Sequence, residues 1–336
     1  MPPLASIAAV EYHLPDRTLS NDELGAMFPE WPPERIKSKL GISTRHLVGP
    51  GEYASDLALK AAERLFHSGA CSPEMIDYVL LCTQSPDYIL PTTACVLQSR
   101  LGIPTHAGAL DFNLGCSGYV YGVSLAKGLI ETGQAQRVLL LTADTYTRYL
   151  EPDDKSVRTV FGDGAAATLV HAVESASSPS LGPFVFGTDG RGAPNLIVHG
   201  GGSRDTEAAS EAATGPPGRA PHLHMNGAEI MTFTLQVVPQ AVSALLTRAN
   251  LQMDEVDFFV FHQANRFVLD KLRQKVGIPE SKFVVSLEHC GNTVSSSIPI
   301  ALKDALVGGT IRSGQLGVLV GFGVGYSWAA GLATCP

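Results

Sequence analysis

The sequence predicts an α/β fold that is built from two similar halves. Short apolar runs of strand length alternate with segments of helical apolar spacing along most of the 336 residues. In addition, two pairs of segments recur at nearly one spacing. Residues 256–264 follow residues 76–84 by 180 positions, and Ser313 follows Thr132 by 181 positions. Two such matches in the same order indicate an internal duplication, because chance matches of short apolar runs rarely share one offset.

Each half is expected to repeat the order helix, strand, turn, helix, strand. Helical spacing over residues 54–67 precedes the apolar run at 76–84, and helical spacing over residues 237–249 precedes the run at 256–264. A change to Ser, Ala and Pro over residues 173–183 predicts the boundary. We therefore assign an N-terminal half to residues 1–172 and a C-terminal half to residues 173–336. The irregular stretch 199–221 is expected to be a surface loop.

The composition favours a tightly packed cytoplasmic enzyme, with 45% hydrophobic residues, 17% charged residues and 34 glycines. A net charge of −8 argues against general nucleic-acid binding. No continuous apolar run reaches the roughly 18 residues of a membrane span, and the first residues lack the pattern of a signal peptide. The six cysteines form no CxxC pair, so the sequence predicts no metal site.

Three polar residues stand in small-residue turns after apolar runs, and together they predict acyl-group chemistry. They are Cys116, His262 and Asn292. A thiol can attack a thioester, while a histidine and a carboxamide can polarise the carbonyl that reacts next. In the duplication His262 falls opposite Cys82, and Asn292 falls in the counterpart of the Cys116 turn, which places all three between the halves.

Each of these residues also has an ordinary structural interpretation. Cys116 precedes a segment of helical spacing, so a helix N-terminus should lower its pKa and favour the thiolate. Alone, it could equally be a buried structural cysteine. A histidine at a strand end is usually structural, and turns commonly use asparagine for local hydrogen bonds. The grouping of the three is what favours function.

Two glycine-rich motifs need separate interpretations. Residues 321–326 resemble a dinucleotide fingerprint but fail it, because Tyr326 stands where the last glycine is required. Backbone amides aimed at a developing oxyanion are the better use for this bend. Residues 161–164 are predicted to form a tight hairpin turn.

The sequence resembles the β-ketoacyl-[acyl-carrier-protein] synthase III family of the thiolase superfamily. The motifs described above occur in the same order as in that family, and the resemblance covers essentially the whole chain. The resemblance implies a thiolase-like five-layer αβαβα fold from two duplicated halves, and a homodimer. It also implies that Cys116 takes an acyl group from acyl-coenzyme A or another acyl thioester, and that no metal or organic cofactor is needed.

The condensation that the resemblance implies uses malonyl-acyl carrier protein. His262 and Asn292 would hold its thioester carbonyl while carbon dioxide leaves, and the enolate would then attack the acyl-enzyme. Backbone amides of Cys116 and Val324 would form the oxyanion hole.

Substrate binding is expected to involve a set of residues that partly departs from the family pattern. Lys39 replaces an arginine and Arg35 stands where a tryptophan is usual, which makes coenzyme A less certain as the donor. Leu90 replaces a phenylalanine at the acyl-pocket wall contributed by the partner subunit, so a longer or bulkier chain is expected. The substrate-binding candidates are Arg35, Lys39, Leu90, Arg158 and Arg266. The segment after His262 is predicted to dock the acidic carrier protein through Lys271, Arg273 and Lys275, with an ordinary solvated helix as the alternative.

Two further functions stay open. The acyl-cysteine could pass its group to an oxygen or nitrogen nucleophile without decarboxylation, or the chain could be a non-catalytic partner subunit of a synthase. The acyl chain, its donor, the pathway and the choice between homodimer and heterodimer do not follow from the sequence.

Overall fold

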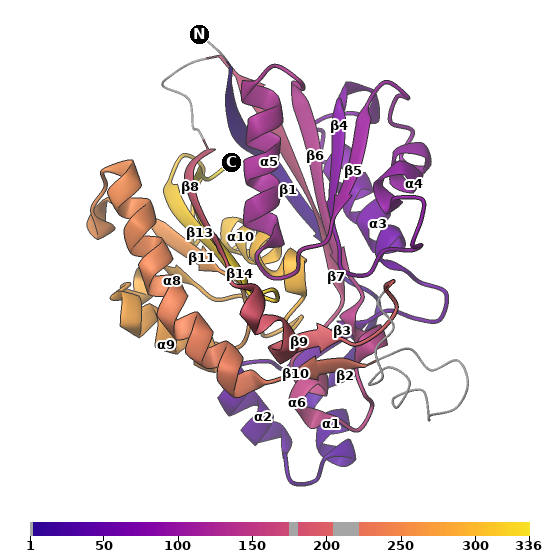
Figure 1. Ribbon diagram of the computed structural model, residues 1–336, viewed down its shortest axis with the longest axis vertical. Helices are drawn as coiled ribbons and strands as arrows, with labels where there is room; N and C mark the ends of the chain where they lie inside the picture. The colour runs from indigo at the N-terminus through magenta and orange to yellow at the C-terminus, as the bar shows by residue number, and fades with distance from the viewer. Residues whose placement is uncertain (1–2, 175–180, 204–221) are drawn as a thin grey trace.

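The computed structural model describes residues 3–174, 181–203 and 222–336, and its core is a pair of five-stranded sheets (Figure 1). The strand order is β1-β7-β6-β4-β5 in one sheet and β8-β14-β13-β11-β12 in the other. In each sheet the last three strands are parallel, and the second strand runs antiparallel to both of its neighbours. The two sheets therefore have one topology, and the predicted duplication is confirmed.

The strands of the two sheets come from separate stretches of the chain. The first sheet contains β1 (Leu4–His13), β4 (Tyr78–Cys82), β5 (Gly108–Phe112), β6 (Arg137–Asp144) and β7 (Gly164–Val173). The second contains β8 (Leu181–Thr188), β11 (Phe258–Phe261), β12 (Phe283–Val284), β13 (Leu316–Gly323) and β14 (Ser327–Thr334). The repeated segments 76–84 and 256–264 contain β4 and β11, which hold equivalent positions in their sheets. The boundary between residues 172 and 173 stays a prediction, and residues 175–180 lie outside the described residues.

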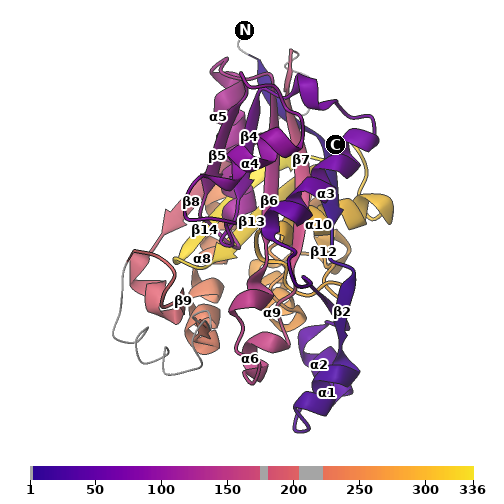
Figure 2. The same ribbon diagram turned by 90° about the vertical axis from the view of Figure 1, so that its right-hand side faces the viewer.

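Helices complete five layers (Figures 1 and 2). The main helices are α3 (Ala54–His67), α4 (Thr93–Arg100), α5 (Gly118–Glu131), α8 (Gly227–Ala249), α9 (Arg266–Val276) and α10 (Ser297–Val307). α5 and α10 form the central layer, and α5 contacts strands of both sheets. α3 and α4 cover the outer face of the first sheet, while α8 and α9 cover the second. α5 and α10 carry small and branched apolar residues around most of their surface, because a sheet lies on each side of them.

Smaller elements gather below the sheets in the view of Figure 1. They are α1 (Asn21–Met27), α2 (Pro33–Leu40), α6 (Lys155–Arg158), the hairpin of β2 (Arg17–Ser20) and β3 (Thr44–Leu47), and the pair β9 (Leu196–Val198) and β10 (Leu223–Met225). Single 3-10 turns occur at Pro73–Met75, Tyr146–Tyr149, Gly190–Asn195, Met253–Glu255, Glu280–Lys282 and Val294–Ser296. Of the expected surface loop 199–221, residues 204–221 lie outside the described residues.

By length and composition α8 could cross a membrane, and no other described helix meets these two criteria. Sequence inspection for continuous apolar runs did not single it out, because polar residues such as Gln236 and Gln240 interrupt the run. In the fold α8 packs against β8, β13, β14 and α9, with Val238, Val242 and Leu245 buried. A core helix of a soluble protein passes the same test, so this is weak evidence for a span.

The predicted hairpin at residues 161–164 is wrong. No strand precedes it, because α6 ends at Arg158, and Phe161 instead forms an isolated parallel bridge with Asn292. Asp163 is fully buried there, where its carboxylate accepts hydrogen bonds from the backbone amides of Val48 and Thr147. The motif has turn-forming residues, but its aspartate anchors two neighbouring loops instead of closing a turn.

Candidate active site

The structure brings the three predicted residues together in one pocket of about 120 Å³. Cys116 lies between β5 and α5, His262 follows β11, and Asn292 lies between β12 and α10. All three therefore stand at the carboxyl ends of parallel strands, where the two halves meet. Apolar side chains complete the lining, among them Phe161, Leu196, Ile230 and Phe322.

Glycines allow the closest approach to the Cys116 thiol. A Cβ atom added at Gly323 would lie 2.7 Å from Cys116 Cβ and 2.8 Å from its Sγ atom. A Cβ at Gly321 would lie 2.6 Å from the Cα atom of Ser117. The glycine bend of β13 therefore packs directly on the turn that carries the cysteine, and no larger residue fits without moving it.

Replacing Gly323 by alanine is expected to displace Cys116 and to slow acyl-enzyme formation at least about 100-fold, since small misplacements of reacting groups cost that much. The measurement is the mass gain of the intact protein with an acyl thioester. Gly128→Ala, at a helix position with open space around its Cβ, is the matched control. Normal acylation of the Gly323 variant would contradict the close packing described above.

Cys116 is only 5% exposed, and its surroundings keep the thiol protonated. Burial and, secondarily, the charge of Asp144 raise the pKa of Cys116 to about 12, against hydrogen bonds from the backbone of Val324 and of Cys116 itself. The predicted thiolate at the helix N-terminus is therefore wrong. α5 begins at Gly118 as expected, but desolvation outweighs the favourable helix end.

This thiol should react with iodoacetamide at a rate that rises about tenfold per pH unit from pH 6 to 9, because the thiolate fraction grows by that factor below the pKa. Mass spectrometry of the peptide that contains Cys116 measures the rate. A plateau near pH 7 would mean that the resting enzyme holds a thiolate.

His262 is positioned as a neutral hydrogen-bond donor. Burial lowers its pKa to about 3, so the imidazole is uncharged at physiological pH. The Ser297 hydroxyl lies 2.7 Å from Nδ1 and accepts a hydrogen bond from the amide of Gln263 at 3.3 Å. We assign the hydroxyl proton to the hydrogen bond with Nδ1, and with this assignment the ring hydrogen is on Nε2.

Asn292 directs its amide group toward the same place. Its Oδ1 atom accepts a hydrogen bond from the amide of Val294 at 2.9 Å, which fixes the orientation of the carboxamide. The Nδ2 atom then lies 3.4 Å from His262 Nε2. Two neutral donors thus stand side by side, 4% and 2% exposed respectively, and can hold one carbonyl oxygen as it gains negative charge.

Three residues of this site, and one beside the substrate-binding candidates, were missed in the sequence. Asp144 at the end of β6 is fully buried and accepts hydrogen bonds from the amides of Gln84 and Ser295, which joins the two halves below the pocket. Ser297 orients His262. Thr234 of α8 lines the pocket with a buried hydroxyl that has no partner among the described residues. Trp31 is the fourth. No local motif marks any of them, although the strand-end position of Asp144 resembles that of His262.

Trp31 gathers two of the substrate-binding candidates. The guanidinium of Arg35 lies 5.3 Å from the Trp31 ring centroid, and the ammonium of Lys39 lies 6.0 Å from it. Lys155 of α6 pairs with the neighbouring Glu30 at 2.6 Å. A tryptophan is therefore present four residues before Arg35, next to both cations.

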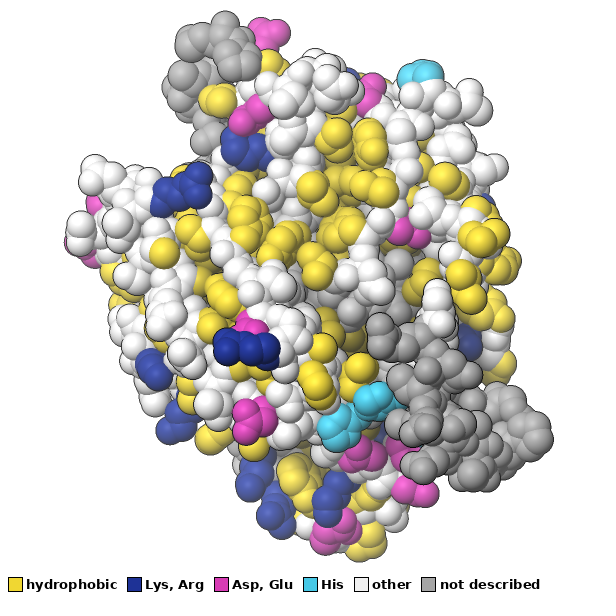
Figure 3. All heavy atoms as spheres, viewed as in Figure 1, with side chains coloured by type: hydrophobic (Ala, Val, Ile, Leu, Met, Phe, Trp, Pro, Cys, Tyr) yellow, Lys and Arg dark blue, Asp and Glu magenta, His cyan; other side chains and the backbone are white. Residues whose placement is uncertain are grey.

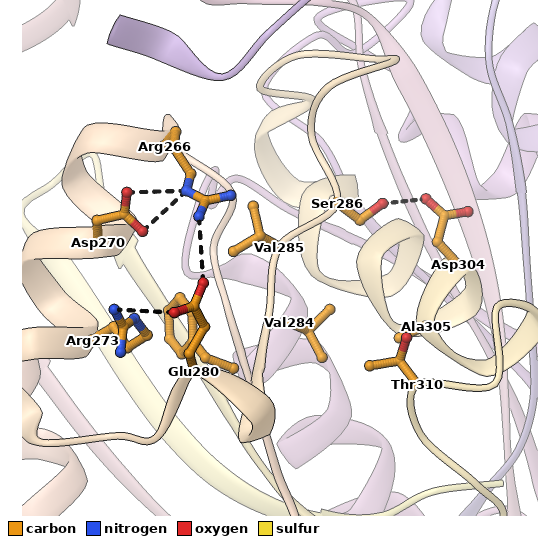
Figure 4. Close-up of a pocket in the computed structure, with 11 residues that line it drawn as sticks. Arg266, Asp270, Arg273, Glu280, Val284, Val285, Ser286, Asp304, Ala305 and Thr310 are labelled. Carbon is orange, nitrogen blue, oxygen red and sulfur yellow. Dashed lines mark hydrogen bonds and ion pairs between the residues drawn. The ribbon is translucent and has the colours of Figure 1, made fainter. Parts of the chain in front are cut away.

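The other substrate-binding candidates lie away from Cys116. Leu90 is 80% exposed and outside the pocket of its own chain. Arg158 lines a separate cleft. Arg266 lines another cleft, between α9, β12 and α10, where it pairs with Asp270 at 3.0 Å (Figure 4).

The predicted docking residues divide into two groups. Lys271 and Lys275 are exposed on α9. Arg273 instead faces Glu280 in the cleft of Figure 4, at 3.9 Å, and donates to the carbonyl of Ile278. Among the described residues, no group of three or more His, Cys, Asp or Glu side chains could hold a metal ion.

A duplicated five-layer fold with a cysteine, a histidine and an asparagine facing one pocket defines a thiolase-like enzyme that transfers acyl groups. The model of 3-oxoacyl-[acyl-carrier-protein] synthase III matches residues 110–190, and the model of its C-terminal region matches residues 246–335. β-Ketoacyl-[acyl-carrier-protein] synthase III 3 of Streptomyces coelicolor is 36% identical over 327 residues, which are 96% of this chain and 95% of that protein.

Solved structures agree with these matches. A 3-oxoacyl-(acyl-carrier-protein) synthase III is 57% identical, with a TM-score of 0.95 over 99% of this chain and 100% of its own. The 3-oxoacyl-(acyl-carrier protein) synthase of Burkholderia xenovorans is 36% identical, with a TM-score of 0.91 over 99% of this chain and 94% of its own. The chain belongs to the 3-oxoacyl-[acyl-carrier-protein] synthase III family.

Proposed function

We propose that this condensing enzyme joins an acyl group to malonyl-acyl carrier protein through an acyl-cysteine at Cys116. The observation that carries the proposal is the convergence of His262 Nε2 and Asn292 Nδ2, two neutral donors, in the pocket that holds a buried thiol. A neutral pair stabilises a developing enolate without holding the malonyl carboxylate, which must leave as carbon dioxide.

In the first step the sulfur of Cys116 forms a bond to the acyl carbonyl carbon, and the donor thiol leaves with the proton. Because the resting thiol is protonated, we expect its proton to pass toward the leaving sulfur as the new bond forms. The backbone amides of Cys116 and Val324 would hold the carbonyl oxygen. No metal or organic cofactor enters this step.

In the second step the bond between the malonyl carboxylate and its α-carbon breaks, and carbon dioxide leaves. The electron pair forms an enolate whose oxygen is held by His262 and Asn292. The α-carbon then attacks the acyl carbonyl, the bond to Cys116 sulfur breaks, and a 3-oxoacyl-carrier protein results. The sulfur leaves with the electron pair and takes a proton from water, which restores the resting thiol.

Coenzyme A is the donor best supported by the residues at Trp31. Its ring could stack on adenine, while Arg35 and Lys39 stand close enough to meet phosphates. This arrangement would compensate for the departures from the family pattern at positions 35 and 39.

A homodimer would give Leu90 a role in the acyl pocket. Tyr88, Ile89 and Leu90 are 59%, 90% and 80% exposed in the connection between β4 and α4, and β5 is an edge strand. Figure 3 shows hydrophobic side chains gathered over the face where α5 lies, and the exposed Leu125 and Phe186 belong to α5 and β8. We expect this face to bind a second copy, with Leu90 entering the partner's pocket and admitting a longer or bulkier chain.

The test is intact-protein mass spectrometry after incubation with acyl-coenzyme A and acyl-carrier thioesters of two to eight carbons, followed by malonyl-carrier protein. A mass gain that is then lost with release of carbon dioxide supports condensation and identifies the donor. Loss of the acyl group to an oxygen or nitrogen nucleophile, without carbon dioxide, would favour the other acyl transfer. No mass gain with any of the donors would favour the non-catalytic subunit.

Carrier-protein docking is expected to depend on Lys271 and Lys275. Changing both to glutamate should raise the KM for malonyl-carrier protein about tenfold, because an acidic partner is then repelled, while acylation by acyl-coenzyme A stays unchanged. Arg191→Glu plus Arg312→Glu, on exposed residues elsewhere, gives the same change in charge as a control. An equal effect of both pairs would mean that net charge, and not this face, controls docking.

A further inference from the structure

A cleft of about 240 Å³ lies apart from the Cys116 pocket and shares no lining residue with it. Three arginines line it: Arg17 of β2, Arg148 of the 3-10 turn Tyr146–Tyr149, and Arg158 at the end of α6. The remaining described lining is Thr147 and residues 47–50, so no carboxylate of a described residue contributes. Three like charges around one cleft are unexpected in a chain whose net charge is −8.

The guanidinium groups of these arginines form few hydrogen bonds with the described residues. Arg158 is half-buried, and its Nε atom is buried with no hydrogen-bond partner in the described part of the chain. The exposed side chain of Arg17 likewise forms no hydrogen bond or ion pair with any described residue. Arg148 is held in place, because it lies 4.7 Å from the Tyr53 ring and donates to the carbonyl of Glu52 at 2.7 Å. Among the described residues, Arg17 and the Nε atom of Arg158 thus lack a hydrogen-bond partner, whereas Arg148 is fixed.

Nearby carboxylates are bonded elsewhere. The Asp163 carboxylate lies beneath the cleft, where it accepts hydrogen bonds from the amides of Val48 and Thr147 and from the Thr147 hydroxyl. The Glu52 carboxylate pairs with Lys60 at 3.0 Å. Asp163 acts electrostatically on Arg148 and Arg158, but its hydrogen bonds come from the two loops that carry part of the cleft. In the described part of the chain, none of the three arginines forms an ion pair with a carboxylate.

The charges also affect one another. Burial first, and the charge of Arg17 second, lower the pKa of Arg158, while Asp163 acts weakly in the opposite direction. Glu23 interacts electrostatically with Arg17, but its carboxylate accepts hydrogen bonds from the amide and hydroxyl of Ser20. A half-buried guanidinium with an unpaired N–H is unfavourable unless an anion meets it.

We propose that the cleft formed by Arg17, Arg148 and Arg158 binds a phosphate group. A dianion matches three guanidinium groups better than a monoanion does, and the planar fork of arginine suits tetrahedral oxyanions. Since the amides of Val48 and Thr147 are already bonded to Asp163, the arginine side chains would supply the contacts.

The phosphate could be free, or it could belong to a larger molecule such as coenzyme A, and titration calorimetry distinguishes these sources. Inorganic phosphate and coenzyme A are titrated at constant ionic strength into wild type, Arg17→Gln, Arg158→Gln and Lys39→Gln. Arg312→Gln is the control for loss of one exposed cation. Arg17→Gln changes an exposed side chain, so it keeps the test valid if Arg158→Gln does not fold.

Binding of phosphate that weakens about tenfold in Arg17→Gln and Arg158→Gln, and stays unchanged in Arg312→Gln and Lys39→Gln, would support a site for free phosphate. If coenzyme A also weakens in the Arg17 and Arg158 variants, the cleft takes a phosphate of that molecule. The proposal is overturned if neither variant changes the affinity for either ligand. Since the readout is binding, this result does not depend on the proposed reaction.

Discussion

Replacing Cys116 by alanine is expected to abolish acyl-enzyme formation completely. No other described side chain in the pocket is a nucleophile of comparable strength, since His262 is held as a neutral donor and Thr234 carries an ordinary hydroxyl. Intact-protein mass after incubation with the donor identified for wild type should show no gain, and 3-oxoacyl product should fall to background.

Cys95→Ala is the control for this variant, because Cys95 is the exposed cysteine among the six. It should acylate like wild type. A mass gain on the Cys116 variant equal to that of wild type would mean that the nucleophile lies elsewhere, and the proposed roles of His262 and Asn292 would lose their basis.

Replacing Asn292 by aspartate should separate the two chemical steps. The Oδ1 acceptor for Val294 is kept, but at pH 8 the Nδ2 donor is replaced by a negatively charged oxygen beside His262 Nε2. Decarboxylation should fall about 100- to 1000-fold, as it does when one oxyanion donor is lost. Acylation of Cys116 should continue, because that step uses backbone amides.

Release of carbon dioxide from malonyl-carrier protein measures the first effect, and the mass of the acyl-enzyme measures the second. Asn250→Asp, at the exposed end of α8, makes the same substitution away from the site. If the Asn292 variant decarboxylated normally, the pair of donors would not be what holds the enolate.

The duplication could be found in the sequence because it rests on local patterns. The repeated apolar runs contain β4 and β11, which occupy equivalent parallel positions. Helical spacing likewise predicted α3 and most of α8. The hairpin prediction at Phe161 failed because the glycines and aspartate of this motif suit a hairpin, whereas Asp163 is bonded to two earlier loops, 16 and 115 residues before it in sequence.

The candidate site was predictable only where a motif marks it. Cys116, His262 and Asn292 each stand in a recognisable turn, and the duplication placed them together. Asp144 and Thr234 have no motif, since their roles depend on which strand or helix comes next to them in space. The protonation state of Cys116 could not be predicted from the sequence either, because its pKa depends on burial that the local sequence does not reveal.

A buried and protonated thiol has a consequence for survival under oxidative stress. Oxidants and electrophiles attack the thiolate, and burial raises the pKa of Cys116 far enough to make that form scarce at pH 7. The cysteine is therefore shielded from peroxide and from most reactive aldehydes, and it remains available to ligands that enter the pocket and fit against its sulfur. Selectivity for the substrate and resistance to chemical damage then have one physical origin.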